Sequence, residues 1–419
     1  MPMIKAWLIG PGEPLPIDGA VRLLRYGILA DMLANVGHTV TQWGTSFAHS
    51  EKRQRSSFDE RIVLNDNHTI QLMRTCGYRK NRSIARLQYL RDEVRAFTRC
   101  AHRLPPPDII LVSMPSPGIC QAVLDYADSL KIPVIVDVRD LWPDIFVDMV
   151  PRPCAPLIRF ALQPALRANR KIFKSATAII AISEEYLKWG LLHAGREKRD
   201  TDRVFPMGYP ALTMSDADRT MANKLWKESG IQAESFLCSF IGTINRHFDF
   251  EPVIASAKEM KDTQFVICGD GDGLARLRKL TSNLENVFLP GWVDSTQILS
   301  LMEISDVALA PYAANAKMSL PNKAFEYFSA GLPVVSSLRG ELEDLLEKYQ
   351  CGVAYDPKKP NDLLRQLRFL ETDGIGTAKM GQRARQLYED TFSANLIYSD
   401  LIRYLENLAQ IRILSAEPS

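Results

Sequence analysis

Lys323 and Glu326 are the residues whose types and spacing most directly suggest chemistry. They lie three positions apart in a helix-forming run over residues 321–330, on neighbouring helix faces. Pro321 suits the first turn of that helix because its φ is fixed and it has no N–H. The free N–H groups of a helix N-terminus bind anions. We therefore predict that the backbone from Leu320 through Asn322 to Lys323 holds a diphosphate, with Glu326 on the ribose hydroxyls of a nucleotide.

The residues that follow predict where this helix ends. Gly331 fits the left-handed position that closes a helix, and Pro333 prevents its continuation. Val334 and Val335 then begin a buried strand. The alternative interpretation is an ordinary helix–strand unit in which Glu326 faces water.

A diphosphate also needs cations, and arginine suits phosphate by its geometry. Residues 236–242 read as a strand that ends in Gly242, and Arg246 follows in the next loop. Residues 265–268 form another strand that leads into glycines at 269, 271 and 273, although the spacing is not that of a dinucleotide fingerprint. Arg246 and Lys323 are the candidates for the diphosphate charge, and Gly242 and Gly269 for close backbone approach.

The N-terminal half predicts a second set of loops at strand ends. Residues 4–10 read as a strand, residues 10–19 as a glycine- and proline-rich loop, residues 21–36 as a helix and residues 39–43 as a strand. Gly19 closes that loop, and Asp140 follows a strand at residues 132–138. Ligands bind at the carboxyl ends of strands in open α/β sheets, so we expect Gly19 and Asp140 near a substrate. A turn glycine and a turn aspartate are the alternatives.

Strands and helices alternate through most of the 419 residues, which predicts an α/β fold of two doubly wound, Rossmann-like parallel-sheet domains. We expect an N-terminal domain at residues 1–209, a linker at 210–231 and a C-terminal domain at 232–393. A C-terminal helix at 394–411 follows.

Charge is unevenly distributed although the net charge is only +2. Residues 1–209 carry 29 Lys and Arg against 21 Asp and Glu. Residues 52–103 are basic, and apolar residues there recur at helical spacing from Ile84 to Phe97. Residues 149–175 have six basic residues, no acidic residue and several apolar ones, with Pro164 expected to kink the helix. Either stretch could lie on an anionic membrane. The alternatives are that the first is a solvated helix face and that the second packs on the domain.

Cysteine usage predicts a reducing compartment. The seven cysteines are scattered, and the sequence has no Cys-x-x-Cys pair and no His-rich cluster, so we expect neither disulfides nor a metal site. The first apolar run is too short for a signal peptide, and no run of 18 apolar residues is present. No nucleic-acid partner is expected.

Residues 318–336 resemble the donor-site signature of the retaining GT-B glycosyltransferases, the large group 1 type that includes bacterial polysaccharide and lipopolysaccharide transferases. The resemblance implies two domains facing across a cleft, with the last helix crossing back to the first domain. Glu326 matches the glutamate that holds the ribose, whereas Met318 stands where the family has its first glutamate. Trp292 lies where the family contacts the base, and Gly19 matches its first glycine loop. Thr243 and Phe248 stand where the family has its phosphate-binding Arg and Lys.

Residues 138–143 (Val-Arg-Asp-Leu-Trp-Pro) resemble a subgroup acting on lipid-linked sugars. The implied function is transfer of a sugar, with retention, from a nucleoside diphosphate sugar (a UDP-sugar is expected) to a hydroxyl of a polyisoprenyl-diphosphate-linked saccharide. No cofactor is implied, and the location would be peripheral, at the cytoplasmic face of the membrane. A GT-B-like sugar-nucleotide epimerase and a non-catalytic sugar-nucleotide-binding protein remain alternatives.

Overall fold

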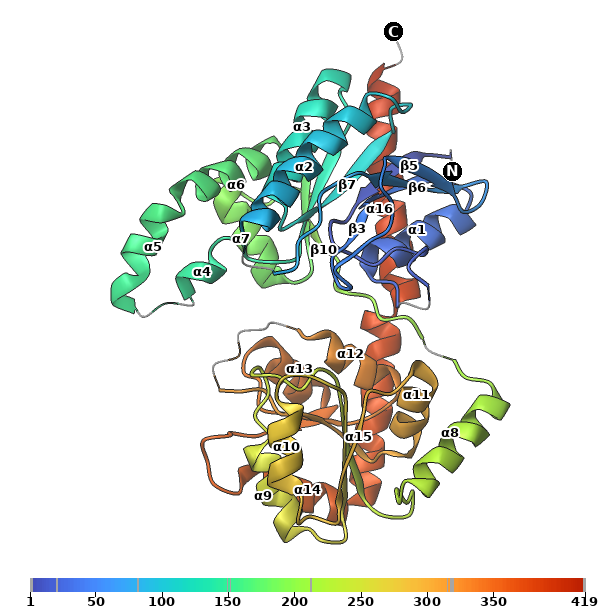
Figure 1. The fold of residues 1–419 in the computed structure, drawn as a ribbon, viewed down its shortest axis with the longest axis vertical. Helices are drawn as coiled ribbons and strands as arrows, with labels where there is room; N and C mark the ends of the chain where they lie inside the picture. Colours follow the sequence, from blue (N-terminus) through green and yellow to red (C-terminus); the bar gives the residue numbers. More distant parts are fainter. Residues whose placement is uncertain are drawn as a thin grey trace. The chain divides into compact units, whose positions relative to one another are not determined.

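The computed structural model describes residues 3–19, 22–80, 83–148, 150, 152–211, 213–314, 316 and 320–416. The chain divides into two compact units (Figure 1). The first contains residues 1–207 and 397–419, and the second contains residues 208–396. Each unit is built around its own mainly parallel sheet, so the predicted α/β class with two Rossmann-like units is confirmed.

The sheet of the first unit has, within the described residues, eight strands in the order β10-β9-β8-β7-β1-β2-β6-β5. All neighbours are parallel except β5 and β6. The order reverses between β1 and β7, as in doubly wound folds. The strands are β1 (Lys5–Ile9), β2 (Thr39–Thr45), β5 (Glu60–Val63), β6 (His68–Met73), β7 (Ile109–Met114), β8 (Val134–Val138), β9 (Ala178–Ala181) and β10 (Arg203–Val204).

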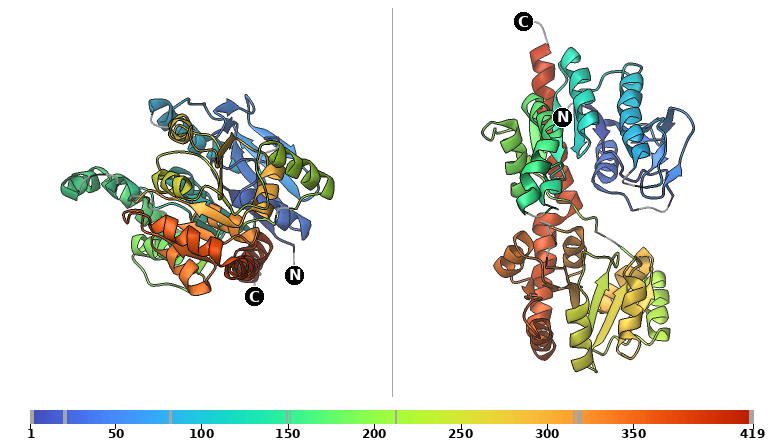
Figure 2. Two further views of the ribbon diagram at one scale, coloured as in Figure 1. Left: turned by 90° about the horizontal axis from the view of Figure 1, so that it is seen from below. Right: turned by 60° about the vertical axis from the view of Figure 1, so that its left-hand side comes forward.

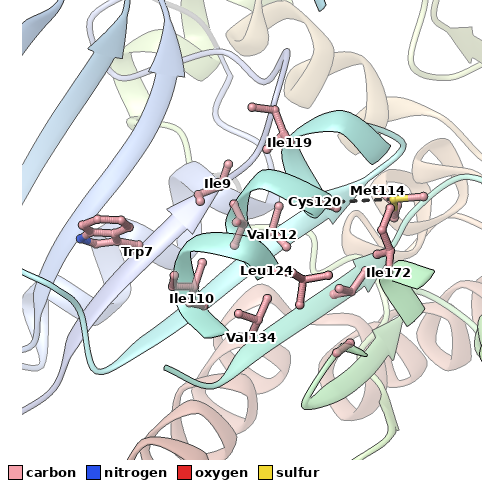
Figure 3. Close-up of a cluster of buried hydrophobic side chains, with 14 of the residues drawn as sticks. Trp7, Ile9, Ile110, Val112, Met114, Ile119, Cys120, Leu124, Val134 and Ile172 are labelled. Carbon is pink, nitrogen blue, oxygen red and sulfur yellow. Dashed lines mark hydrogen bonds between the residues drawn. The ribbon is translucent and has the colours of Figure 1, made fainter. Parts of the chain in front are cut away.

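Apolar side chains between the sheet and its helices form the core of the first unit. Trp7 and Ile9 of β1, Val112 of β7 and Leu124 of α3 belong to one buried cluster (Figure 3). In α/β sheets both faces are covered, which is why these strands read as continuous apolar runs. The helices are α1 (Arg25–Asn35), α2 (Ile84–Ala101), α3 (Pro117–Leu130), α6 (Gln163–Ser175) and α7 (Glu184–Ala194). A two-stranded hairpin of β3 (Phe47–Ala48) and β4 (Arg53–Gln54) follows β2.

Helix α2 is amphipathic, but its phase differs from the prediction. The predicted apolar positions Ile84, Leu87 and Leu90 are exposed to solvent. Of the other predicted apolar positions, Val94 packs against the core and Phe97 is buried, on a face that also includes Tyr89 and Glu93. Periodicity alone cannot choose between two apolar faces of one helix.

Two helices lie in the stretch of residues 149–175. Helix α5 (Ala155–Ala161) extends away from the sheet of the first unit (Figure 1), whereas α6 packs on α3 and α7 and buries Ile172 and Phe173 in the core. Short helix α4 (Ile145–Asp148) precedes a 3-10 turn (Arg152–Cys154) and α5 (Ala155–Ala161), and α6 follows. Pro164 lies in the first turn of α6, so the proline separates two helices rather than kinking one. None of the side chains of α5 is buried.

The second unit has a six-stranded parallel sheet in its described residues, in the order β13-β12-β11-β14-β15-β16. The strand order reverses between β11 and β14, and helices cover both faces of the sheet (Figure 2). Its strands are β11 (Leu237–Ile241), β12 (Gln264–Cys268), β13 (Val287–Gly291), β14 (Val307–Ala310), β15 (Val334–Ser336) and β16 (Gly352–Ala354). The helices are α9 (Glu251–Glu259), α10 (Leu274–Thr281), α11 (Ser295–Ile304), α12 (Asn322–Ser329), α13 (Glu341–Tyr349), α14 (Asp362–Thr372) and α15 (Gly374–Leu387).

Two elements lie at the expected domain boundaries. Residues 210–231, expected to be a linker, contain α8 (Asp216–Glu228), which packs on α11 and buries Ala222 and Trp226. This stretch therefore belongs to the second unit, because two apolar side chains anchor it there. A π-helical turn (Tyr388–Phe392) precedes α16 (Ala394–Ala416), whose residues from Ile397 onward belong to the first unit. There Glu406 contacts His38 at 2.9 Å.

Candidate functional site

Helix α12 starts at the predicted position, because Pro321 is its N-cap residue and Asn322 its first helical residue. Gly331 follows the helix with φ of +72°, the left-handed closure expected from the sequence. Along the chain the helix comes after β14 and before β15, so the loop from the carboxyl end of β14 leads to its N-terminus. Since β14 neighbours β11 where the strand order reverses, α12 starts at the ligand-binding crevice of a doubly wound sheet.

Lys323 extends from α12 to the carboxyl end of β11. Its Nζ lies 4.4 Å from the ring centroid of Phe240 and 5.7 Å from those of Phe248 and Tyr327. A Cβ at Gly242 would overlap Nζ of Lys323, so only glycine leaves room for this ammonium group. The side chain is therefore held by aromatic faces directly over the glycine turn that follows β11.

Burial lowers the pKa of Lys323 to about 8, against the opposing effect of the charge of Glu326. Burial also raises the pKa of the neighbouring Cys268 thiol to about 12, so that the thiol is neutral at pH 7. The positive charge of the Lys323 ammonium group is thus only partly balanced by negative charge nearby. An anion bound at the tip of α12 would stabilise its charged form.

Glu326 is half-buried, and its carboxylate does not face bulk solvent freely. The hydroxyl of Tyr209 donates a hydrogen bond of 2.8 Å to Oε1 of Glu326. Tyr209 is itself fixed, since its N–H donates to Phe392 O and its carbonyl accepts from the hydroxyl of Tyr388, both at 2.9 Å. The carboxylate is therefore held in one orientation, one turn behind the helix tip.

The glycine turns after β11 and β12 pack backbone against backbone. Gly242 donates to Cys268 O at 3.0 Å, and a Cβ at Gly269 would overlap the carbonyl oxygen of Gly242. Gly269, with φ of +135°, in turn donates to Gly291 O at 2.7 Å. The predicted glycine positions Gly242 and Gly269 are brought together, beneath Lys323.

Other candidate residues of the second unit lie differently. Arg246 is exposed and lines a cavity of about 340 Å³ together with Arg276 and Asp272, whereas it is Lys323 that reaches Gly242. Trp292 is exposed at the end of β13. Leu320 is half-buried and Asn322 exposed at the start of α12. Met318 lies outside the described residues.

The first unit places its two candidates in loops at the carboxyl ends of β1 and β8. Gly19 has φ of +85° and is exposed. Asp140 is half-buried, and burial raises the pKa of its carboxyl group against the opposing hydrogen bond from the N–H of Leu141. Arg139, beside it, forms an ion pair with Glu13 of the glycine- and proline-rich loop. The two loops are thus joined by a buried charge pair.

Sequence reasoning missed the residues that orient the site. Tyr209 reads as part of a strand-breaking Gly-Tyr-Pro run, and nothing in that run indicates a partner over a hundred positions away. Phe240 reads as a strand residue, Phe248 as the residue at the position of the family's lysine, and Glu13 as a loop residue. Among the described residues, we find neither a group of His, Cys, Asp and Glu fit to hold a metal ion nor a helix long and apolar enough to span a membrane.

Comparison with known proteins gives three kinds of match. Residues 222–387 match the family described as Glycosyl transferases group 1. The putative colanic acid biosynthesis glycosyltransferase WcaL of Escherichia coli (strain K12) is 27% identical over 166 residues, 37% of this chain and 41% of that protein. The sulfoquinovosyl transferase SQD2 of Arabidopsis thaliana is 23% identical over 284 residues, 67% of this chain and 53% of that protein. The alignments thus span about half the length of these curated relatives.

The solved structure of Anabaena Alr3699/HepE in complex with UDP has the same fold. Its TM-score is 0.68 at 17% identity, and the alignment covers 97% of this chain and 100% of that one. The strand orders described above are those expected of such a pair of Rossmann-like units. Residues 222–387 therefore match the group 1 glycosyl transferases, and the chain as a whole has a GT-B fold.

Proposed function

We propose that this protein transfers a sugar, with retention, from a nucleoside diphosphate sugar bound by the second unit to a hydroxyl acceptor bound by the first. One observation carries the proposal. At the strand-order reversal, α12 directs a lysine over a glycine turn and holds a tyrosine-oriented carboxylate one turn further on. This arrangement matches the needs of a diphosphate and a ribose.

The chemistry follows from the charge of the leaving group. As the bond to the sugar breaks, negative charge grows on the departing diphosphate. The N–H groups at the tip of α12 and the ammonium group of Lys323 stabilise that charge, which is electrostatic catalysis. The leaving phosphate then accepts the proton of the acceptor hydroxyl on the same face of the sugar, so that no separate protein base is required.

We propose a UDP-sugar as the donor. The support is the fold shared with a protein whose structure contains UDP. Glu326 provides the acceptor oxygens that ribose hydroxyls need. Gly242 and Gly269, in backbone contact, leave room for a phosphate chain to approach.

We propose a polyisoprenyl-diphosphate-linked saccharide as the acceptor, at the cytoplasmic face of the cell membrane. The name of WcaL places that relative in the synthesis of colanic acid. In the chain itself, α5 exposes Leu157 and Phe160 at 71% and 77%, with Arg159 between them, and α4 exposes Ile145 and Phe146. Helix α6 adds Arg167, Arg170, Lys171 and Lys174. An apolar surface with cations beside it favours an anionic bilayer.

The test is release of UDP from a UDP-sugar in the presence and absence of the lipid-linked acceptor. A transferase releases UDP when the acceptor is added. An epimerase converts the sugar nucleotide without acceptor, and a binding protein does neither. The donor itself is identified by thermal-shift screening with UDP-, GDP-, ADP- and dTDP-sugars, since a ligand of the native state raises the melting temperature. UDP release by wild type but not by Lys323→Gln would support the proposed site.

A further inference from the structure

A cluster of basic and aromatic side chains belongs to the first unit, whereas the site on α12 belongs to the second. We define the basic–aromatic cluster as His49, Lys52, Tyr78 and Arg86. Nζ of Lys52 lies 3.4 Å from Nδ1 of His49 and 4.5 Å from the ring centroid of Tyr78. The guanidinium of Arg86 lies 5.9 Å from the same centroid, and the hydroxyl of Tyr78 contacts Nδ1 of His49.

The cluster lies where an open α/β sheet binds ligands. His49 and Lys52 follow β2, and Tyr78 follows β6, the parallel neighbour of β2. The carboxyl ends of both strands therefore deliver these residues to one edge of the sheet. Tyr78 is buried against Phe47 and Tyr89, with ring centroids 5.0 and 5.2 Å away, so it forms a fixed floor. The three basic side chains are half-buried, within reach of a ligand.

The positive charges of the cluster repel one another. Burial and then the charges of Lys52 and Arg86 lower the pKa of His49, and burial and then Arg86 lower that of Lys52. Arg86 also lies in the first turn of α2, at the positive end of the helix dipole. The nearby carboxyl group of Glu93 has its pKa raised by burial to about 8, so it is mostly neutral at pH 7. Electrostatics at this edge therefore favour an anion.

An apolar surface continues from the cluster along α2. Ile84 and Leu87, three positions apart and on either side of Arg86, are 77% and 58% exposed. Residues with this spacing share one side of a helix. A ligand that carries an anionic group and a hydrocarbon chain would contact both surfaces at once.

We propose that the basic–aromatic cluster binds the diphosphate of a lipid-linked acceptor, with the first isoprene units against Ile84 and Leu87. This inference rests on the proposed function, because it assigns a place on the first unit to the acceptor of that reaction. Arg86 and Lys52 provide the charge-assisted hydrogen bonds and His49 an additional donor. The same phosphate chemistry occurs in phospholipid headgroups, so the test must separate the two sources.

The first arm uses inorganic pyrophosphate as the probe, with binding measured by calorimetry. All proteins carry Lys323→Gln, so that the site on α12 contributes little. We expect Lys52→Gln and Arg86→Gln each to weaken pyrophosphate binding at least tenfold. The matched control is Arg95→Gln, which removes an exposed charge from the same helix, where Arg95 is 3.8 Å from Asp92. Unchanged binding in Arg86→Gln, or an equal loss in Arg95→Gln, would overturn the proposal.

The second arm separates the sources of phosphate. Farnesyl diphosphate should bind at least tenfold more tightly than pyrophosphate, and Leu87→Ser should remove that gain. Sedimentation with phosphatidylglycerol vesicles should be the same for wild type and Arg86→Gln. Loss of vesicle binding in Arg86→Gln, or equal affinity for the two diphosphates, would assign the cluster to another ligand and contradict the proposal.

UDP binding separates this proposal from the proposed function. UDP affinity measured in Arg86→Gln alone should equal that of wild type. Thermal unfolding like that of wild type shows that the first unit of the variant is folded. A wild-type protein that fails to bind UDP but binds farnesyl diphosphate through Arg86 would refute the proposed UDP-sugar donor and leave the proposed diphosphate site standing.

Discussion

Lys323 and Gly242 occupy complementary space, because the ammonium group of Lys323 lies where a side chain at position 242 would have to begin. Gly242 also has φ of +150°, a conformation that favours glycine. The cation and the glycine that we propose for phosphate binding thus depend on each other, although they lie on separate elements of the second unit.

Gly242→Ala should displace Lys323 and weaken UDP binding about tenfold or more. It should also destabilise the second unit through its φ of +150°, but less than Gly269→Ala does, because the overlapping atom ends a flexible side chain. Gly269→Ala should destabilise the second unit more strongly, because its Cβ would overlap the backbone carbonyl of Gly242. Calorimetric UDP binding and thermal unfolding measure the two effects. Gly374→Ala, where a Cβ would meet open space, is the control. Equal melting temperatures for the Gly242 and Gly269 variants would contradict this distinction.

Lys323→Met should weaken UDP binding and yet stabilise the free protein at pH 7. Burial lowers the pKa of Lys323 to about 8, below that of an unfolded lysine, so the unfolded state binds more protons between pH 8 and about 10.4. The destabilisation is therefore complete below pH 8 and is relieved as pH rises through that range. We expect a gain of about 1–3 kcal/mol in the free energy of unfolding at pH 7.

The same lysine predicts the pH dependence of donor binding. Wild-type affinity for UDP should fall as pH rises above about 8, where Lys323 loses its proton, and Lys323→Met should lack that component. Bound UDP should shift the midpoint upward, because an anion favours the charged lysine. The measurement is UDP affinity between pH 7 and 9 for wild type and Lys323→Met. The same pH dependence in both proteins would exclude Lys323 from the site.

Glu326→Gln and Tyr209→Phe should differ in magnitude. Glu326→Gln removes charged hydrogen bonds to ribose, which contribute about 1.5–3 kcal/mol, so UDP should bind about 10- to 100-fold more weakly. Tyr209→Phe removes only the hydrogen bond that orients the carboxylate, for a loss of about 2- to 10-fold. Glu347→Gln, an exposed carboxylate on α13, is the control and should change nothing. A larger effect for Tyr209→Phe would mean that Glu326 does not contact the ligand.

Leu157→Ser with Phe160→Ser should reduce binding to vesicles that contain phosphatidylglycerol at least tenfold. Both side chains are exposed, so the melting temperature should be unchanged. Leu192→Ser on α7, 79% exposed in the same unit, is the matched control and should bind vesicles as wild type does. Equal losses in the two proteins would point to general surface hydrophobicity instead of a specific membrane contact.

The helix at residue 321, its glycine closure and the following strand could be predicted because local sequence determines them. The same holds for the glycine turns after β11 and β12. The path of the loop after β11 could not be predicted. Its local sequence does not determine whether Arg246 or Lys323 reaches Gly242. The strands β3, β4 and β5 could not be predicted either, because they are short and lie at edges, where alternation is weak. The hydrogen-bond partner of Glu326 could be identified only from the tertiary structure.

Tyr209 also has a consequence for communication along the chain. The polypeptide enters the second unit at Gly208 and leaves it after Leu396, and there Tyr209 N–H donates to Phe392 O and Ala394 N–H to Tyr209 O, both at 2.9 Å. The carboxylate proposed to hold the ribose is bonded to the side chain of this same residue. Filling the nucleotide site should therefore slow hydrogen exchange at the Tyr209 and Ala394 amides, so that the two connecting segments report whether donor is bound.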